Sequence, residues 1–182
     1  MGTVMSVNRG AGMKTAVAKL QPSQVLSSRW QTPGILAATV IGLLVVVLAF
    51  TIDPELTGKY VKVYGSVAGK LSVFALLLLP FLLLQRRRLT VRYALLGSIT
   101  RFLRKWHIPA AILVLGCTIA HMYLAVANGF VINFRNVTGI LALVIMAGVY
   151  GSGLVIPKAN WRKLHIVSGV AFAGVLLLHM AK

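Results

Sequence analysis

The sequence predicts an all-α membrane protein, built as a single bundle of about five transmembrane helices. Hydrophobic residues make up 58% of the 182 residues and the mean hydropathy is +0.87, whereas soluble domains contain about 45–50% apolar residues. Five apolar stretches reach the length at which a helix crosses a bilayer. They lie at about 34–52, 63–85, 107–128, 137–155 and 164–181. The short connections leave no room for a second folded domain, so residues 31–182 are expected to form one bundle.

The basic residues predict how this bundle is oriented. The net charge is +17, and 14 of the 19 lysines and arginines lie in the N-terminal segment and in the second and fourth connections. Both acidic residues, Asp53 and Glu55, lie in the first connection, on the opposite side. The positive-inside rule therefore makes the N-terminus cytoplasmic and the C-terminus external, as in an integral protein of a bacterial inner membrane or its equivalent. The basic face suits anionic lipid headgroups, and its distribution over loops argues against a nucleic-acid partner.

The N-terminal third contains one charged residue inside a span. Residues 1–30 are polar and basic, without the apolar core of a signal peptide, and we expect a cytoplasmic arm. The first span has no ionisable residue and is expected to face lipid. The second contains Gly65 and Gly69, which indicate a seam of small residues for helix packing, followed by Lys70. With these boundaries Lys70 lies near the outer end of its span, where a lysine faces the protein interior or a cavity, or extends to the membrane surface.

The rest of the chain begins with the longest connection, at 86–105. Residues 92–104 are amphipathic and predict a helix at the membrane surface. The third span follows, with Pro109 in its first turn, where the missing N–H costs little. The fourth span is rich in glycine and is expected to pack closely against its neighbours. Cys117, the only cysteine, is interpreted as a small packing residue.

The third and fifth spans repeat one pattern that contains all four histidines of the chain. Arg104-Lys105-Trp106-His107-Ile108 leads to His121, and Arg162-Lys163-Leu164-His165-Ile166 leads to His179. In both copies the two histidines occupy positions i and i+14. An α-helix returns position i+14 to nearly the same face after about four turns, roughly 21 Å further along its axis. Two such helices that face each other and run in the same direction would pair His107 with His165 and His121 with His179.

This constellation points to two haems, held between the third and fifth helices. A histidine inside a membrane is costly unless it is hydrogen-bonded or ligated. Hydrogen bonds between helices, or a proton path, would account for one or two histidines better than for four in matched pairs. Zinc sites gather three or four ligands at one point, whereas haem brings its own equatorial nitrogens and needs only two axial ligands. The chain has no Cys-x-x-Cys-His motif, so the haems are expected to be bound non-covalently.

Basic residues near each histidine pair are candidate partners for haem propionates. At the inner pair they are Arg104, Lys105, Arg162 and Lys163, which also set the topology. At the outer pair they are Lys70, Lys59, Lys62 and Arg135, which alternatively attract an anionic acceptor. Gly116 and Gly174 each precede an outer histidine by five residues and are expected either to let the macrocycle approach or simply to pack helices. Phe172, midway along the fifth span, is interpreted as a packing residue.

The paired histidines resemble the ferric reductase-like transmembrane module. This module is shared by NADPH oxidases, ferric reductases and the haem subunit of the periplasmic methionine sulfoxide reductase system. The resemblance covers about residues 34–182 and depends on His107, His121, His165 and His179. It implies two b-type haems that pass electrons from a cytoplasmic reductant to an outer acceptor: oxygen, ferric iron, quinone or a periplasmic protein.

The resemblance also implies a partner, because many members carry a sixth span and a flavin and nicotinamide domain. No dinucleotide-binding glycine motif occurs in this chain. A separate cytoplasmic donor is therefore expected, such as an acidic flavoprotein, a ferredoxin or a flavodoxin that docks on the basic face.

Three functions stay open at this point. The first is an electron-transfer cytochrome that works with a partner reductase, as the membrane component of an oxidoreductase. The second is a cytochrome b membrane-anchor subunit of a larger quinone-linked complex. The third is a non-redox haem-binding or proton-handling membrane protein. Two axial histidines leave no open position on either iron, which disfavours substrate chemistry at the metal and favours the first function.

Overall fold

The computed structural model describes residues 22–86, 94–154 and 159–181, and the regular structure of these residues is helical. The elements are α1 (Pro22–Phe50), the short 3-10 helix η1 (Pro54–Leu56), α2 (Thr57–Leu76), α3 (Leu78–Arg86), α5 (Ala94–Ala127), α6 (Phe134–Leu154) and α7 (Ala159–Met180). α1 begins within the segment expected to be an arm, and residues 1–21 lie outside the described residues.

Within the described residues, five helical segments are long and apolar enough to cross a membrane. They are Thr32–Phe50, Thr57–Phe81, Leu95–Ala127, Phe134–Leu154 and Asn160–Met180. This finding confirms the all-α membrane fold and the predicted number of spans. Many large apolar side chains on the outside of the bundle are exposed, among them Leu36 and Val144, as expected for a surface that contacts lipid.

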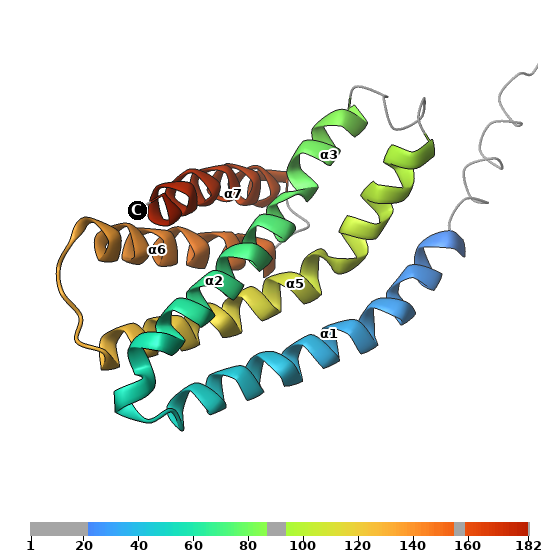
Figure 1. Ribbon diagram of the computed structural model, residues 1–182. Helices are drawn as coiled ribbons and strands as arrows, with labels where there is room; N and C mark the ends of the chain where they lie inside the picture. Colours follow the sequence, from blue (N-terminus) through green and yellow to red (C-terminus); the bar gives the residue numbers. More distant parts are fainter. Residues whose placement is uncertain (1–21, 87–93, 155–158, 182) are drawn as a thin grey trace, which may run out of the picture.

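The second span begins earlier than predicted. Its expected start was near residue 63, but α2 begins at Thr57. The N–H of Leu56 donates to the carbonyl oxygen of Asp53 at 2.9 Å, so η1 turns the chain directly into α2. Near its other end the span is broken at Leu77, because Pro80 has no N–H to donate to Leu76. α3 then continues past the break (Figure 1).

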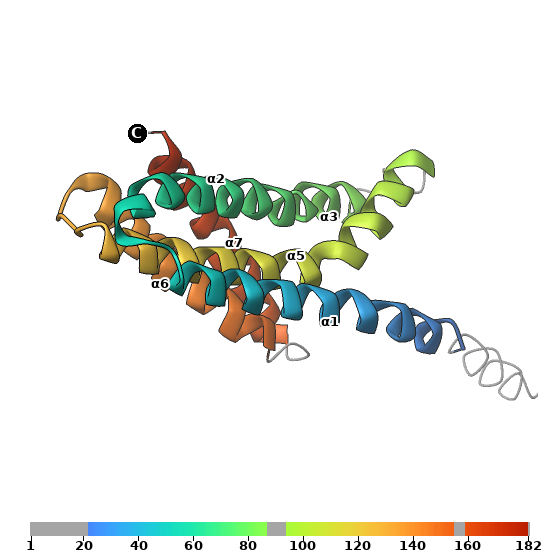
Figure 2. The same ribbon diagram turned by 60° about the horizontal axis from the view of Figure 1, so that its bottom comes forward.

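The surface helix predicted at 92–104 is not a separate element. Its described residues, 94–104, form the start of α5, a single helix of 34 residues. No proline interrupts the chain between Ala94 and Pro109, so the helix of the third span is continuous with the amphipathic segment that precedes it. The ring of Pro109 crowds the carbonyl of Lys105 and removes one helical hydrogen bond. α5 bends in its first third (Figure 2).

Two antiparallel helix pairs make up most of the bundle (Figure 1). α2 packs along α5, α6 packs along α7, and α1 packs along another side of α5. α5 and α7 run in the same direction, and both end where α2 and α6 begin. The backbones of α5 and α7 approach each other less closely than those of the packed pairs. A cluster of buried side chains, Val114, Ala142, Met146, Phe172 and Leu176, joins α5, α6 and α7.

Candidate imidazole-pair sites between α5 and α7

The four histidines lie in two pairs across the space between α5 and α7. The ring centroids of His107 and His165 are 6.3 Å apart, with an angle of 82° between the ring planes. Those of His121 and His179 are 6.4 Å apart, with an angle of 75°. These are the pairs that the repeated i, i+14 spacing predicts, and they form because α5 and α7 run in the same direction with their histidines at matching heights.

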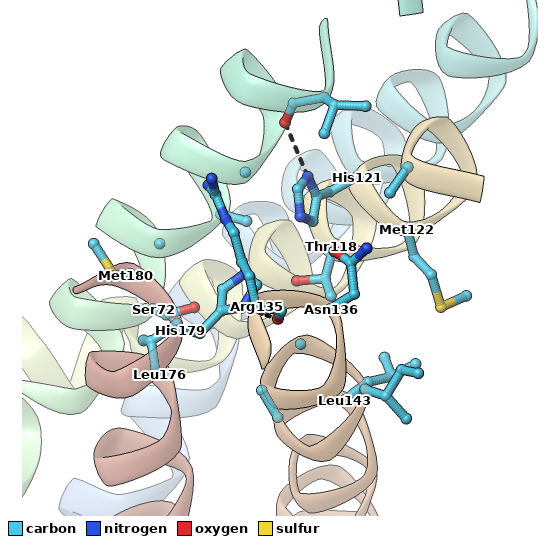
Figure 3. Close-up of a pocket in the computed structure, with 18 of the residues that line it drawn as sticks. Ser72, Thr118, His121, Met122, Arg135, Asn136, Leu143, Leu176, His179 and Met180 are labelled. Carbon is cyan, nitrogen blue, oxygen red and sulfur yellow. Dashed lines mark hydrogen bonds between the residues drawn. The ribbon is translucent and has the colours of Figure 1, made fainter. Parts of the chain in front are cut away.

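Each imidazole is held from behind by a backbone carbonyl of the neighbouring helix. On α5, Nδ1 of His107 lies 3.2 Å from the carbonyl oxygen of Ala75, and Nδ1 of His121 lies 2.9 Å from that of Val61. A carbonyl oxygen only accepts hydrogen bonds, so Nδ1 carries the proton in both rings. Nε2 is then the nitrogen with a free lone pair. Figure 3 shows His121 bonded to α2 on one side, with its second ring nitrogen on the side facing His179.

The α6–α7 pair repeats the same arrangement. Nδ1 of His165 lies 2.9 Å from the carbonyl oxygen of Val149, and Nδ1 of His179 lies 3.0 Å from that of Arg135. The accepting carbonyls are therefore also 14 residues apart within each helix: those of Val61 and Ala75 in α2, and those of Arg135 and Val149 in α6. Among the described residues, Nε2 of the four rings makes no hydrogen bond.

Two hydroxyl groups strengthen the anchors in α6. Thr138 donates to the carbonyl oxygen of Arg135 at 2.8 Å and lies 3.3 Å from Nδ1 of His179. Ser152 donates to the carbonyl oxygen of Gly148 at 2.7 Å and lies 3.4 Å from Nδ1 of His165. Hydrogen bonds of this kind fix the tautomer and orientation of imidazoles that bind metals.

Glycines in α2 and α6 make room for three of the rings. A Cβ atom on Gly65 would lie 2.8 Å from Cε1 of His121, one on Gly139 would lie 3.1 Å from Cε1 of His179, and one on Gly153 would lie 3.3 Å from Cε1 of His165. Only glycine allows the first of these contacts without a shift of the ring. The sequence predicted that these glycines pack helices closely. The structure adds that they leave space for the histidine rings.

A cavity of about 350 Å³ lies beside the His121–His179 pair. Both histidines line it, together with two cationic side chains from the predicted set, Lys62 and Arg135. Figure 3 shows the Arg135 side chain extending from α6 toward α2. The cavity thus places positive charge next to the imidazoles, and reaches inward as far as Phe172.

A layer of buried side chains separates the two histidine pairs. The layer contains Ala68, Val114, Ala142 and Phe172. In α5 and α7, Val114 and Phe172 lie midway between the two histidines of the helix. In α2 and α6, Ala68 and Ala142 lie midway between the two residues whose carbonyls bond the histidines. Phe172 is the only large side chain in this layer and is 8% exposed. Its predicted packing role agrees with this burial.

The other basic residues predicted to contact a haem are exposed. Arg104, Lys105, Arg162 and Lys163 flank His107 and His165 and are exposed. Lys70 is also exposed, and it is absent from the residues that line the cavity. Lys70 lies near the middle of the helical segment Thr57–Phe81.

The two glycines before the outer histidines have different surroundings. A Cβ atom on Gly116 would lie 2.8 Å from the carbonyl oxygen of Gly42, so Gly116 serves the contact between α5 and α1. A Cβ atom on Gly174 would meet nothing within 4 Å. Of the two roles expected for Gly116, helix packing is confirmed.

The arrangement suits a group that needs two axial ligands at each of two positions. Within the described residues, no three histidine, cysteine or acidic side chains gather at one point, as a zinc site would require. Each pair instead presents two imidazole nitrogens, one from α5 and one from α7. The sequence signal that was missed is a second repeat: Thr138-Gly139 recurs at position i+14 as Ser152-Gly153, and the two copies mark the anchors in α6.

Comparison of the sequence with protein-family models and with curated proteins, and of the fold with solved structures, finds no match.

Proposed function

We propose that this chain is a b-type dihaem membrane cytochrome that carries electrons across the bilayer. One observation supports the proposal above all others: four imidazoles form two facing pairs, each ring anchored through Nδ1 with Nε2 left for a ligand.

The spacing of the rings fits an iron between them. A bond from a metal to an imidazole nitrogen is about 2 Å long. Two such bonds, together with the distance from each nitrogen to its own ring centre, add up to about 6 Å. The centroid separations of 6.3 and 6.4 Å agree with this sum. Haem supplies four equatorial nitrogens and one-electron chemistry.

Different residues of the chain would then orient the histidines and pair with the haem propionates. The carbonyls of Ala75, Val61, Val149 and Arg135 keep the histidines in the tautomer that presents Nε2. Lys62 and Arg135, which line the cavity, are the proposed propionate partners at the His121–His179 pair. Arg104, Lys105, Arg162 and Lys163 have this role at the other pair.

The proposed orientation of the chain follows from its charge distribution, and the direction of electron flow is what the family resemblance implies. We propose that the N-terminus and the basic connections are cytoplasmic and that the C-terminus is outside. An acidic flavoprotein, ferredoxin or flavodoxin would deliver electrons on the basic side. The outer acceptor would be oxygen, ferric iron, quinone or a periplasmic protein, as the resemblance to the ferric reductase-like module implies.

Orientation can be tested at the loop between α5 and α6, where Ile132 is 84% exposed. In a Cys117→Ala background, Ile132→Cys should react with a membrane-impermeant maleimide added to intact spheroplasts. Labelling only after permeabilisation would invert the proposed topology.

Haem stoichiometry tests the function itself. Protein expressed with ample haem should contain two b-type haems per chain by pyridine haemochrome assay. His107→Ala and His121→Ala should each contain one, with different residual spectra, because each removes one axial ligand of a different pair.

Ile108→Ala is the matched control, since Ile108 adjoins His107 and is 47% exposed; it should keep both haems. A wild-type protein with one haem or none, or histidine variants that keep two, would contradict the dihaem proposal.

A further inference from the structure

Arg135 contributes to the His121–His179 pair in two ways. Its backbone carbonyl oxygen accepts a hydrogen bond from Nδ1 of His179 at 3.0 Å. Its side chain lines the cavity beside the pair and extends from α6 toward α2 (Figure 3). One residue thus fixes the orientation of one ring and places a positive charge in the cavity that both rings line.

The positive charge of Arg135 also acts on the opposite ring of the pair. His121 lines the same cavity from α5 and interacts electrostatically with Arg135. For His107, the interaction of this kind is with His165, the other ring of its own pair. The His121–His179 pair thus has a cation in its immediate electrostatic surroundings.

Neither hydrogen bonding nor topology accounts for an arginine at this position. Of the four residues whose carbonyls hold the histidines, Arg135 is the charged one, and the others are Val61, Ala75 and Val149. Every residue has a backbone carbonyl, so the bond to His179 needs no particular side chain. In the proposed orientation Arg135 also lies on the side that has few basic residues. A positive charge here therefore indicates a role at the cavity.

No carboxylate side chain offsets this charge within the cavity. The only acidic residues of the chain, Asp53 and Glu55, precede α2 and are absent from the cavity lining. Lys62, which does line the cavity, adds a second cation. Among the described residues, the lining is therefore positively charged, and it suits a bound group that gains a negative charge.

We propose that Arg135 raises the reduction potential of the haem at the His121–His179 pair, an inference that rests on the proposed dihaem function. Reduction adds one electron to that haem, donated by the haem at the His107–His165 pair, and a nearby cation stabilises the added negative charge. An ion pair between Arg135 and a propionate acts in the same direction, because it neutralises a carboxylate that opposes reduction. In the proposed orientation, this effect favours electron transfer toward the outer side.

A redox titration followed by visible absorption tests the inference on one haem at a time. The His107→Ala background keeps the haem at the His121–His179 pair, and the His121→Ala background keeps the other haem. Arg135→Gln retains the backbone carbonyl but removes the charge. In the His107→Ala background it should lower the midpoint potential by about 59 mV, which is a tenfold change in the equilibrium constant for one electron. In the His121→Ala background it should leave the midpoint potential unchanged, and Arg135→Lys should leave it unchanged in both.

Arg101→Gln is the matched control for net charge, since Arg101 is exposed and does not line the cavity; it should leave the midpoint potential of the His107→Ala background unchanged. An unchanged potential in Arg135→Gln, or an equal fall in Arg101→Gln, would overturn the inference and leave the dihaem function intact. Loss of the haem in Arg135→Gln, restored in Arg135→Lys, would make Arg135 a binding residue and would also overturn it. A wild-type protein without haem would contradict the proposed function itself.

Discussion

An imidazole in a bilayer becomes a dependable metal ligand only when one nitrogen is protonated and held in place. In this chain the holding group is a backbone carbonyl, which is present at every residue and carries no sequence signature. The carbonyls of Val61 and Ala75 can accept a hydrogen bond from a histidine in addition to their helical bond, because each oxygen has two lone pairs. What the sequence must supply is space for the ring, and glycine supplies it for three of the four histidines.

Gly65→Ala tests this role of glycine. The new Cβ would lie 2.8 Å from Cε1 and 2.9 Å from Nδ1 of His121, so the ring must move off the Val61 carbonyl. We expect loss of the haem at the His121–His179 pair and retention of the other, measured by haem-to-protein ratio. Gly174→Ala has open space and should keep both haems, with slightly higher stability from better helix propensity. Two haems in Gly65→Ala would show that the ring tolerates displacement.

At this scale the sequence predicts the histidine pairs but only part of their surroundings. His107, His121, His165 and His179 could be paired because one spacing occurs twice, and helical geometry converts spacing into position. The choice between the two roles expected for Gly116 could not be made, because its place five residues before His121 does not reveal which neighbouring helix it faces. That information depends on the packing of α1, which no local pattern encodes.

Among the helices, α1 has the least connection to the histidines and the clearest packing contact. It meets α5 where Gly42 and Gly116 let the two backbones touch, a close approach that small residues permit in membranes. Helix number followed from hydropathy, whereas helix boundaries did not. α5 is continuous from Ala94 into the third span because no proline interrupts it before Pro109, and hydropathy does not distinguish a surface helix from the extension of a span.

Gly116→Ala separates a packing role from a haem role at the level of the helix. Its Cβ would lie 2.8 Å from the carbonyl oxygen and 2.9 Å from Cα of Gly42, and a backbone cannot yield as a side chain does. Overpacking of this kind costs about 1–3 kcal/mol, so we expect a lower thermal midpoint in detergent with two haems still bound. Loss of the haem at His121–His179 without a change in the midpoint would instead favour the haem role of Gly116.

Two antiparallel helix pairs, α2–α5 and α6–α7, make up most of the molecule, and both hold their histidines in the same way. One helix of each pair holds histidines at positions i and i+14, and the other holds the accepting carbonyls at the same spacing. Direct links between the pairs are fewer than links within them. Tyr150 of α6 donates a hydrogen bond to the carbonyl of Ala111 in α5, and the cluster around Phe172 packs between them. A haem ligated by α5 and α7 would join the two pairs at two more levels.

Haem should therefore contribute to stability as a bridge. A ligand that binds only the folded state at a hundred times its dissociation constant stabilises it by about 2.7 kcal/mol. We expect protein purified from haem-deficient cells to unfold at a clearly lower temperature than haem-loaded protein, measured by the change in tryptophan fluorescence on heating. Tyr150→Phe removes one of the other links, so it should lower the midpoint more in the haem-deficient protein than in the loaded one. Equal thermal midpoints with and without haem would mean that protein contacts alone hold α5 and α7 together. Haem binding would then add nothing to the stability of the bundle.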